Sequence, residues 1–288
     1  MSWHFERGSF DGFESVTVRT ERARLVLIAG AGPRIAFFGR PDGEKNALYW
    51  NRDGMVRGDW RLLGGHRVWL TRPMADESED TYAEDSRPCR LEMEIGDGEV
   101  CATAPPHPFT QLERGIRVRV LGENCFEVTN FIKNTGPLVY SGGVWSPTCI
   151  NPKGKVIRVP LGEEGATWDM VHIVIPRVFA GNTATVEDSQ VTFEGNEMVV
   201  RSQGRLTKRC AGAPRGEVSM EWPEEGLVFT KKAEYVRGGR YPLGGCNVAV
   251  FIGENDWMGE LETFGAEQTV RPGETICNRE IWKLEDRR

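Results

Sequence analysis

The sequence lacks paired cysteine motifs. Its seven cysteines stand singly along the chain, and no two of them form a Cys-x-x-Cys pair. An odd number of isolated thiols is typical of reduced, mostly buried side chains rather than of a disulfide framework or a zinc site. We therefore expect free thiols, and we assign no metal ligand.

Motifs for metal, nucleophilic and nucleotide chemistry are missing as well. The four histidines do not form an HExxH metal motif, and no GxSxG elbow indicates a serine hydrolase. Gly30 and Gly32 lack the third glycine of a dinucleotide fingerprint, and phosphate-cradling loops are absent. The acidic residues at 76–80 and 84–85 lack the ordered spacing of a calcium loop, so we expect a solvated loop there. We predict no cofactor.

The chain also has no basic excess and no long apolar run. With 36 lysines and arginines against 42 acidic residues, its net charge is −6, which disfavours nucleic acid and anionic membranes as partners. The N-terminus shows no apolar segment behind a basic stretch, and no later run is long enough to span a bilayer. We expect a cytoplasmic protein that binds neither nucleic acid nor membrane. A small neutral molecule is still a possible ligand.

What the chain does have is many short β-type runs. They are separated by turn signals such as Asp42-Gly43 and Arg237-Gly-Gly239, and the 34 glycines and 16 prolines supply further turns. No segment has a helical apolar period over ten or more residues. The expected strands cover residues 14–20, 24–29, 34–38, 90–95, 115–121, 125–132, 139–145, 156–160, 167–175, 191–193, 198–202, 217–222, 227–235, 246–252, 258–264 and 275–284.

These runs predict an all-β fold. No internal repeat of fixed period is present, which weighs against a propeller or a solenoid. No linker divides the chain, so we expect one domain over residues 1–288, with residues 1–20 as a peripheral N-terminal strand.

Glu260 and Glu262 are the first candidate site residues. In a strand they share one face, while Leu261 and Thr263 point to the other. Ionised carboxylates are costly to desolvate without a partner, so two of them on one buried face indicate a ligand or a counter-charge. The alternative is that this face is simply solvated.

A second candidate segment follows the glycine pair at 64–65. Arg67 and Trp69 share a face in a strand, while His66 points the other way. An arginine beside an aromatic ring suits a sugar, whose apolar face stacks on the ring while its hydroxyls take hydrogen bonds. The alternative is a core tryptophan beside an arginine that pairs with a structural carboxylate.

Lys231 and Lys232 lie on opposite faces of an expected strand, and Phe229 shares the face of Lys231. One lysine therefore points inward, where it can partner Glu260 or Glu262. A buried Lys–Glu pair is purely structural in many proteins.

Three more polar or aromatic residues are candidates for the wall of a cleft. Trp145 precedes Ser-Pro at the exit of a strand, where it either lines a cleft or packs in the core. Tyr241 and Asn247 can hydrogen-bond sugar hydroxyls, but they serve equally well in turns.

Taken together, these segments resemble the galactose-mutarotase-like superfamily, and in particular a bacterial branch of it. This superfamily of β-supersandwich proteins includes aldose 1-epimerases and hexose-phosphate epimerases. The resemblance covers the chain from about residue 20 onward. It rests on the motifs Gly64-Gly-His-Arg-Val-Trp-Leu, Trp145-Ser-Pro-Thr, Phe229-Thr-Lys-Lys, Tyr241-Pro-Leu-Gly-Gly, Glu260-Leu-Glu-Thr-Phe-Gly, Pro272-Gly-Glu and Trp282.

The resemblance implies a large antiparallel β-supersandwich and a sugar ligand. Leu261-Glu262-Thr263 is similar to the family's Leu-Glu-Thr, which makes Glu262 the base that takes a proton from the anomeric hydroxyl. The family's acid is a histidine on a middle strand, but the matching segment here reads Val144-Trp145-Ser146. His66 or Lys231 could replace that acid, although the resemblance implies neither.

Two functions follow from these residues and from the resemblance. The first is a carbohydrate mutarotase or epimerase with Glu262 as base, His66 or Lys231 as acid, and Arg67, Trp145 and Asn247 around the sugar. The second is a carbohydrate-binding protein without turnover, which the missing histidine favours. A scaffold without a ligand is the third interpretation.

Overall fold

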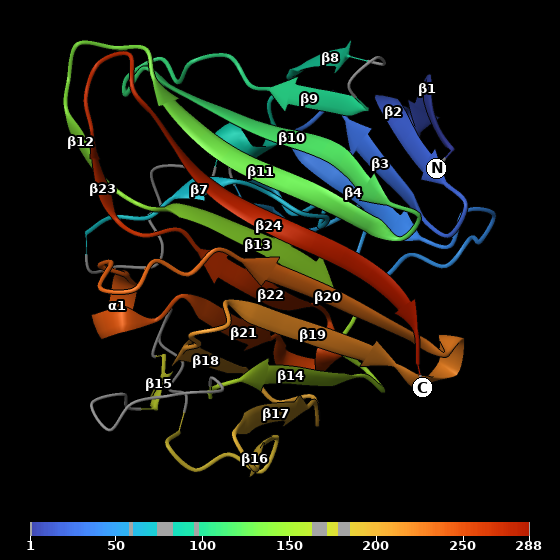
Figure 1. The fold of residues 1–288 in the computed structure, drawn as a ribbon, viewed down its shortest axis with the longest axis vertical. Helices are drawn as coiled ribbons and strands as arrows, with labels where there is room; N and C mark the ends of the chain where they lie inside the picture. The colour runs from blue at the N-terminus through green and yellow to red at the C-terminus, as the bar shows by residue number, and fades with distance from the viewer. Residues whose placement is uncertain are drawn as a thin grey trace.

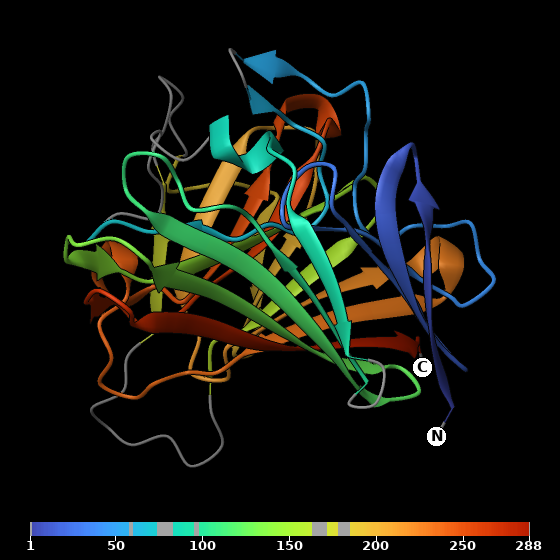
Figure 2. The same cartoon turned by 90° about the horizontal axis from the view of Figure 1, so that it is seen from above.

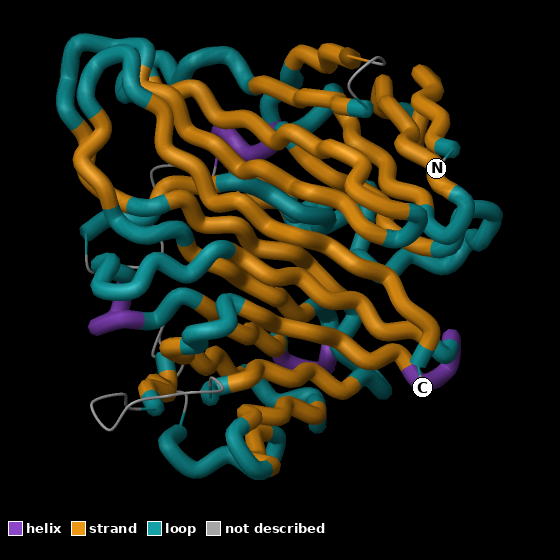
Figure 3. The backbone as a smooth tube through the Cα atoms, in the orientation of Figure 1, coloured by secondary structure: helices purple, strands orange, loops and turns teal. Residues whose placement is uncertain are grey.

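The computed structural model describes residues 2–57, 60–73, 83–94, 98–162, 172–177 and 185–287. Strands make up most of this part of the chain (Figure 3). The all-β prediction is confirmed, and the single α-helix of the described residues, α1 (Pro242–Gly245), has four residues. None of the helices described there is long and apolar enough to cross a membrane.

The largest sheet has ten antiparallel strands and forms the front layer in Figure 1. Its strands alternate apolar and polar side chains, so one face lies on the core and the other on solvent. In order across the sheet they are β16 (Val191–Glu194), β17 (Glu197–Arg201), β14 (Val156–Pro160), β19 (Glu217–Trp222), β20 (Leu227–Ala233), β24 (Thr275–Asp286), β11 (Cys125–Asn134), β10 (Leu112–Gly122), β9 (Glu99–Thr103) and β8 (Arg90–Glu94).

A six-stranded antiparallel sheet forms the second layer (Figure 2). Its central strands β22 and β13 are buried along their whole length, because both of their faces are covered. Across the sheet the order is β15 (Ile173–Pro176), β18 (Thr207–Gly212), β21 (Val248–Ile252), β22 (Gly259–Phe264), β13 (Val144–Ile150) and β7 (Trp69–Leu70).

The N-terminal part of the chain forms a four-stranded sheet beside this layer. His66 forms isolated β-bridges to Ile35 on one side and to Thr148 on the other, so it connects the four-stranded sheet to β13. Residues 3–20, expected at the periphery, form the hairpin at the outer edge. The four strands are β1 (Trp3–Phe10), β2 (Phe13–Thr20), β3 (Arg24–Ile28) and β4 (Arg34–Gly39).

Short elements complete the described chain. Two small ribbons pair β12 (Tyr140–Gly142) with β23 (Gln268–Val270) and β5 (Val56–Arg57) with β6 (Trp60–Arg61). The expected strand 139–145 is thus divided between β12 and β13. The strands β5, β6, β9, β18 and β23 were not predicted, and the expected strand 167–175 lies partly outside the described residues.

An aromatic cluster marks the centre of the core between the layers. Phe38 on β4 packs edge to face on Phe126 at a centroid distance of 5.8 Å and on Phe229 at 5.2 Å. Trp282 on β24 lies 5.5 Å from Phe38. All four side chains are buried, and burying such rings contributes about 1.5–3 kcal/mol each. The core therefore holds the four-stranded sheet against the ten-stranded one.

Candidate functional site

The six-stranded sheet has two chemically different faces. Its inner face, toward the ten-stranded sheet, carries core residues such as Val248, Val250 and Leu261. Its outer face carries a separate apolar cluster that includes Trp69, Trp145, Cys210, Tyr241, Cys246, Ala249 and Phe264. Because side chains alternate along a strand, Glu260 and Glu262 both lie on the outer face, as predicted.

The carboxylate of Glu262 is buried on this outer face, where the side chains of Trp145 and Lys208 contact it. The Trp145 indole Nε1 donates a hydrogen bond of 2.8 Å to Glu262 Oε2. Lys208 Nζ lies 3.1 Å from the same oxygen and 5.2 Å from the centre of the Trp145 ring. All three side chains are almost fully buried. A lysine charge thus compensates the cost of burying the carboxylate.

Lys208 comes from β18, two strands away from Glu262. In the register of the sheet Ala249 lies between Glu262 and Cys210, and its small side chain leaves room for the lysine to reach across. Lys208 follows Thr207 in a run whose charges do not alternate with apolar residues, which is why the sequence did not reveal this strand.

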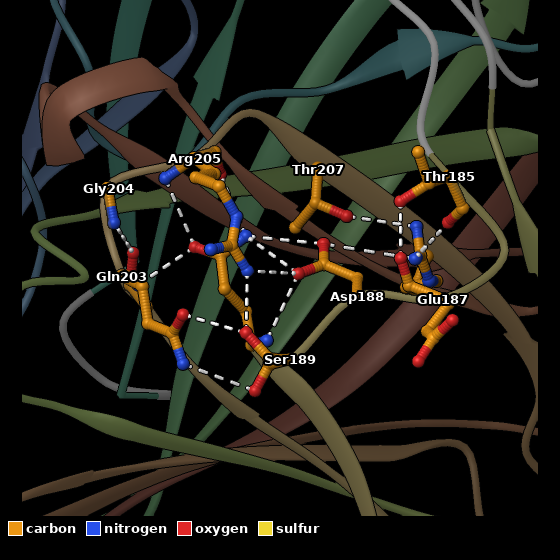
Figure 4. Close-up of polar contacts among 11 residues, drawn as sticks. Thr185, Glu187, Asp188, Ser189, Gln203, Gly204, Arg205 and Thr207 are labelled. Atoms are coloured by element: carbon orange, nitrogen blue, oxygen red, sulfur yellow. Dashed lines mark hydrogen bonds and ion pairs between the residues drawn. The ribbon is translucent and has the colours of Figure 1, made fainter.

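The backbone beside Lys208 is fixed by a network of polar contacts (Figure 4). Buried Arg209 donates hydrogen bonds to the Lys208 carbonyl at 3.3 Å and to the Thr207 hydroxyl at 2.9 Å. The Asp188 carboxylate accepts from Arg205 at 3.0 Å, and it lies 3.8 Å from Arg209. These contacts anchor β18 and hence the lysine.

Glu260 belongs to a second group of buried charges. Arg67 Nη2 donates to Glu260 Oε1 at 2.6 Å, and Arg67 Nη1 lies 3.3 Å from Asp85. Arg34 lies 2.9 Å from the same Asp85 carboxylate. Burial by itself would raise the pKa of Asp85, but the guanidinium groups of Arg34 and Arg67 hold that pKa well below its usual range.

The expectation of a solvated loop at residues 84–85 is therefore wrong for Asp85. It is buried, and its other oxygen accepts a hydrogen bond of 3.0 Å from the Trp69 indole. The residues at 76–80 lie outside the described part of the chain. No group of three metal-ligating side chains is found among the described residues.

Arg67 and Trp69 share a face, as predicted, with the guanidinium 4.8 Å from the ring centre. Trp69 packs edge to face on Trp145 at 4.9 Å, and Trp145 stacks parallel to Phe264 at 6.2 Å. Trp69, Trp145 and Phe264 thus form an aromatic row across three strands, which connects the buried charges around Glu260 to those around Glu262. Arg67 pairs with carboxylates and Trp69 is buried, which matches the structural alternative set out above.

His66 does not share the face of Glu262. Its ring is fully buried between the Thr148 hydroxyl and the Asn130 side-chain oxygen, each 2.8 Å from a ring nitrogen. Burial lowers the pKa of His66 to about 3. The histidine is neutral at physiological pH and bridges the two layers.

Lys231 also lies on the inner side of the sheet. Its inward direction is confirmed, but its carboxylate partner is Glu280 at 3.0 Å, not Glu260 or Glu262 as expected. Burial by itself would raise the pKa of Glu280, but the ammonium group of Lys231 lowers it below its ordinary value. Glu280 lies among the inward side chains of β24, and the alignment of β24 with β20 brings it to Lys231.

Asn247 and Tyr241 hydrogen-bond to backbone groups. Asn247 exchanges two hydrogen bonds with the backbone of Ala213, at 2.7 and 2.8 Å. The Tyr241 hydroxyl accepts from the Val236 amide at 2.8 Å, and its ring stacks on Tyr235. Both residues hydrogen-bond the backbone next to the outer face of the sheet. This is the role in turns that the sequence offered as the alternative to sugar binding.

No family model matches this chain, and no curated protein matches it. Solved structures do. A protein provisionally named a mutarotase from Salmonella typhimurium aligns with a TM-score of 0.63 and 13% identity over 98% of this chain and 94% of its own. A provisionally named aldose 1-epimerase from Escherichia coli K12 gives 0.60 and 12% over 99% and 100%.

A galactose mutarotase-like protein from Lactobacillus casei aligns with a TM-score of 0.62 and 11% identity, over 94% of this chain and 100% of its own. The chain has the galactose mutarotase-like fold. This confirms the β-supersandwich prediction, and at such low identity the likeness concerns the fold alone. Within that fold, the outer face around Glu262 is the candidate site.

Proposed function

We propose that this protein binds a sugar or sugar derivative on the outer face of the six-stranded sheet, at Glu262. The observation that carries this proposal is the buried contact of Glu262 with Trp145 and Lys208. It combines an acceptor for hydroxyl groups, a flat apolar ring and a donor within one hydrogen-bonded group. The proteins with mutarotase and epimerase names that share the fold support a sugar-type ligand.

Binding at this site requires a rearrangement of the residues that cover it. Glu262 and Trp145 are buried, and partly buried Ile173, Tyr235 and Leu243 pack against the aromatic cluster. A sugar reaches the carboxylate when such covering side chains move aside, and it then replaces their apolar contacts with stacking on the tryptophans. Arg67 and Glu260 lie at the other end of the aromatic row and would contact a larger ligand.

Mutarotation is the second candidate. Glu262 would take the proton of the anomeric hydroxyl while an acid protonates the ring oxygen, which opens the ring. The aldehyde group at C1 then rotates about the C1–C2 bond, and closure gives the other anomer. His66 and Lys231 lie on the other face of the sheet, so Lys208 replaces them as the candidate acid. The sugar would have to separate Lys208 from Glu262, and binding without turnover is therefore the better supported function.

Two measurements on the wild-type chain test these candidates. Calorimetry with D-galactose, D-glucose, D-glucuronate and D-glucose 6-phosphate should show saturable binding of at least one of them. Absence of heat with all four contradicts the proposed function. Polarimetry of freshly dissolved sugar then separates the candidates, because only a mutarotase accelerates anomeric equilibration above the buffer rate.

A further inference from the structure

Lys231 crosses the interior of the protein to reach the backbone of the candidate site. It belongs to β20 in the ten-stranded sheet, but its ammonium group contacts β13 and β22 in the six-stranded sheet. Nζ lies 2.8 Å from the Ser146 carbonyl oxygen and 3.2 Å from the Leu261 carbonyl oxygen. The Thr148 hydroxyl lies 2.8 Å from Nζ. The lysine therefore bridges β13 and β22 from the side of the ten-stranded sheet.

The contacted carbonyls adjoin the two residues that define the site. Leu261 directly precedes Glu262, and Ser146 directly follows Trp145. Because alternate side chains leave a strand on opposite faces, Trp145 and Glu262 project outward next to the carbonyl groups that Lys231 contacts from the inner face. A change in that backbone contact would change the distance between the indole and the carboxylate.

Stability alone does not account for a charge at this position. An apolar core surrounds the polar groups that Lys231 contacts, and replacing a buried ion pair by hydrophobic residues is often neutral or stabilising. The Glu280 carboxylate that compensates Lys231 is itself fixed by the Trp282 indole at 2.8 Å and by the Thr263 hydroxyl. Asn278 adds hydrogen bonds of 3.0 Å to the Ser146 hydroxyl and 2.9 Å to the Thr263 hydroxyl.

Apart from the contacts of Glu280 with Lys231 and Trp282, these polar contacts end on the same short stretches of β13 and β22. The three protons of the Lys231 ammonium group face four acceptors, so the group has an internal hydrogen-bonding role and does not reach the outer face. Buried and fully hydrogen-bonded networks of this kind favour one backbone geometry over its alternatives.

We propose that Lys231, with Glu280 as its counter-charge, is a positioning residue that sets the backbone of β13 and β22 so that Trp145 and Glu262 meet on the outer face. The inference rests on the proposed function of that face as a sugar site. It replaces the role of acid that the sequence suggested for Lys231.

The test is the double variant Lys231→Met with Glu280→Gln, which removes both buried charges together. Its indole ¹⁵N–¹H spectrum should show the Trp145 resonance displaced, because the hydrogen bond to Glu262 changes; the resonance is assigned with Trp145→Phe. Affinity for the sugar bound by wild type should fall about tenfold, since partners that orient binding groups contribute on this scale in metal sites.

Phe229→Leu is the matched control. Phe229 shares the inward face of β20 with Lys231 and packs on Phe38 and Trp282, so its substitution perturbs the same core without removing a hydrogen bond to the two site strands. It should lower the stability while leaving the Trp145 resonance and the sugar affinity unchanged. If the control displaces the Trp145 resonance as much as the double variant does, the positioning role is refuted.

A folded double variant with an unmoved Trp145 resonance and wild-type affinity also overturns the inference. If the double variant does not fold, Lys231→Gln with Glu280→Gln, which also removes both charges but keeps polar side chains, takes its place and the same readouts decide. If wild type binds none of the four sugars, the proposed function fails by itself, and the Trp145 resonance still tests the positioning role without any ligand.

Discussion

The ammonium group of Lys208 lies 3.1 Å from the carboxylate of Glu262 on the outer face of the six-stranded sheet. The two residues sit on strands separated by β21, on which Ala249 is the register partner of Glu262 and Phe251 is the register partner of Lys208. Both charges are buried, so each is compensated by the other and by the Trp145 indole. Stability and the proposed sugar binding therefore depend on the same pair.

Substitution Lys208→Met should destabilise the protein by about 3–5 kcal/mol, because it leaves a buried carboxylate without its counter-charge. Urea unfolding measures the loss. The double variant Lys208→Met with Glu262→Leu removes both charges and should recover most of the stability, but it should bind no sugar. Equal stability of Lys208→Met and wild type would show that the ion pair does not compensate Glu262.

Substitution Glu262→Gln should lower sugar affinity by roughly 10- to 100-fold, since it removes a charged hydrogen-bond acceptor. Titration calorimetry with the sugar that wild type binds measures this loss. Glu274→Gln is the control, because that carboxylate is about half exposed at the β23–β24 turn and lies outside the site. Unchanged affinity in Glu262→Gln would remove Glu262 from the site, and any mutarotation should also vanish in this variant.

His66 makes stability depend on pH. Its pKa of about 3 in the folded protein lies below the ordinary 6.5, so the unfolded chain takes up a proton that the folded chain does not. The contribution is complete above pH 6.5 and is lost as the pH falls toward 3, at up to about 1.4 kcal/mol per pH unit.

His66→Gln should flatten this dependence, because glutamine can hydrogen-bond with Thr148 and Asn130 but does not titrate. Unfolding in urea at about pH 7 and about pH 5 compares the two proteins. The charged groups around the ring, Glu280, Lys231 and Arg67, are the same in both. Parallel pH profiles would show that His66 is protonated in the folded protein.

Asp85→Asn should destabilise the protein by about 3–5 kcal/mol, because it leaves buried Arg34 and Arg67 with one fewer counter-charge. Asp286→Asn is a closely matched control. Asp286 also lies between two arginines, Arg22 and Arg40, but at the surface, so its loss should cost about 1 kcal/mol or less. Similar losses in both variants would contradict the buried role of Asp85.

Some features of the fold and the site followed from alternation alone. The period of two along β22 placed Glu260 and Glu262 on one face, and the same period paired Arg67 with Trp69 and turned Lys231 inward. The pattern says which face a side chain takes. It does not say what covers that face, which is why solvent stayed an alternative for residues that are buried.

Other features needed contacts between distant strands. Lys208 lies in a strand without apolar alternation. The sequence around Glu280 does not show that β24 pairs with β20, the strand of Lys231. His66 looked available as an acid because the segment Val144-Trp145-Ser146 lacks the histidine that the resemblance leads one to expect. Its burial between Thr148 and Asn130 results from the packing of two sheets.

The sequence by itself determined that the fold is all-β and which neighbouring side chains of a predicted strand share a face, because both depend on local backbone geometry and turn chemistry. Only the tertiary structure decided which charges meet. Strand order and register set the distances between side chains, and they bring Lys208 to Glu262 and Lys231 to Glu280 on opposite sides of one sheet. Electrostatic partnership depends on those distances, and a one-residue change of register would exchange the two faces.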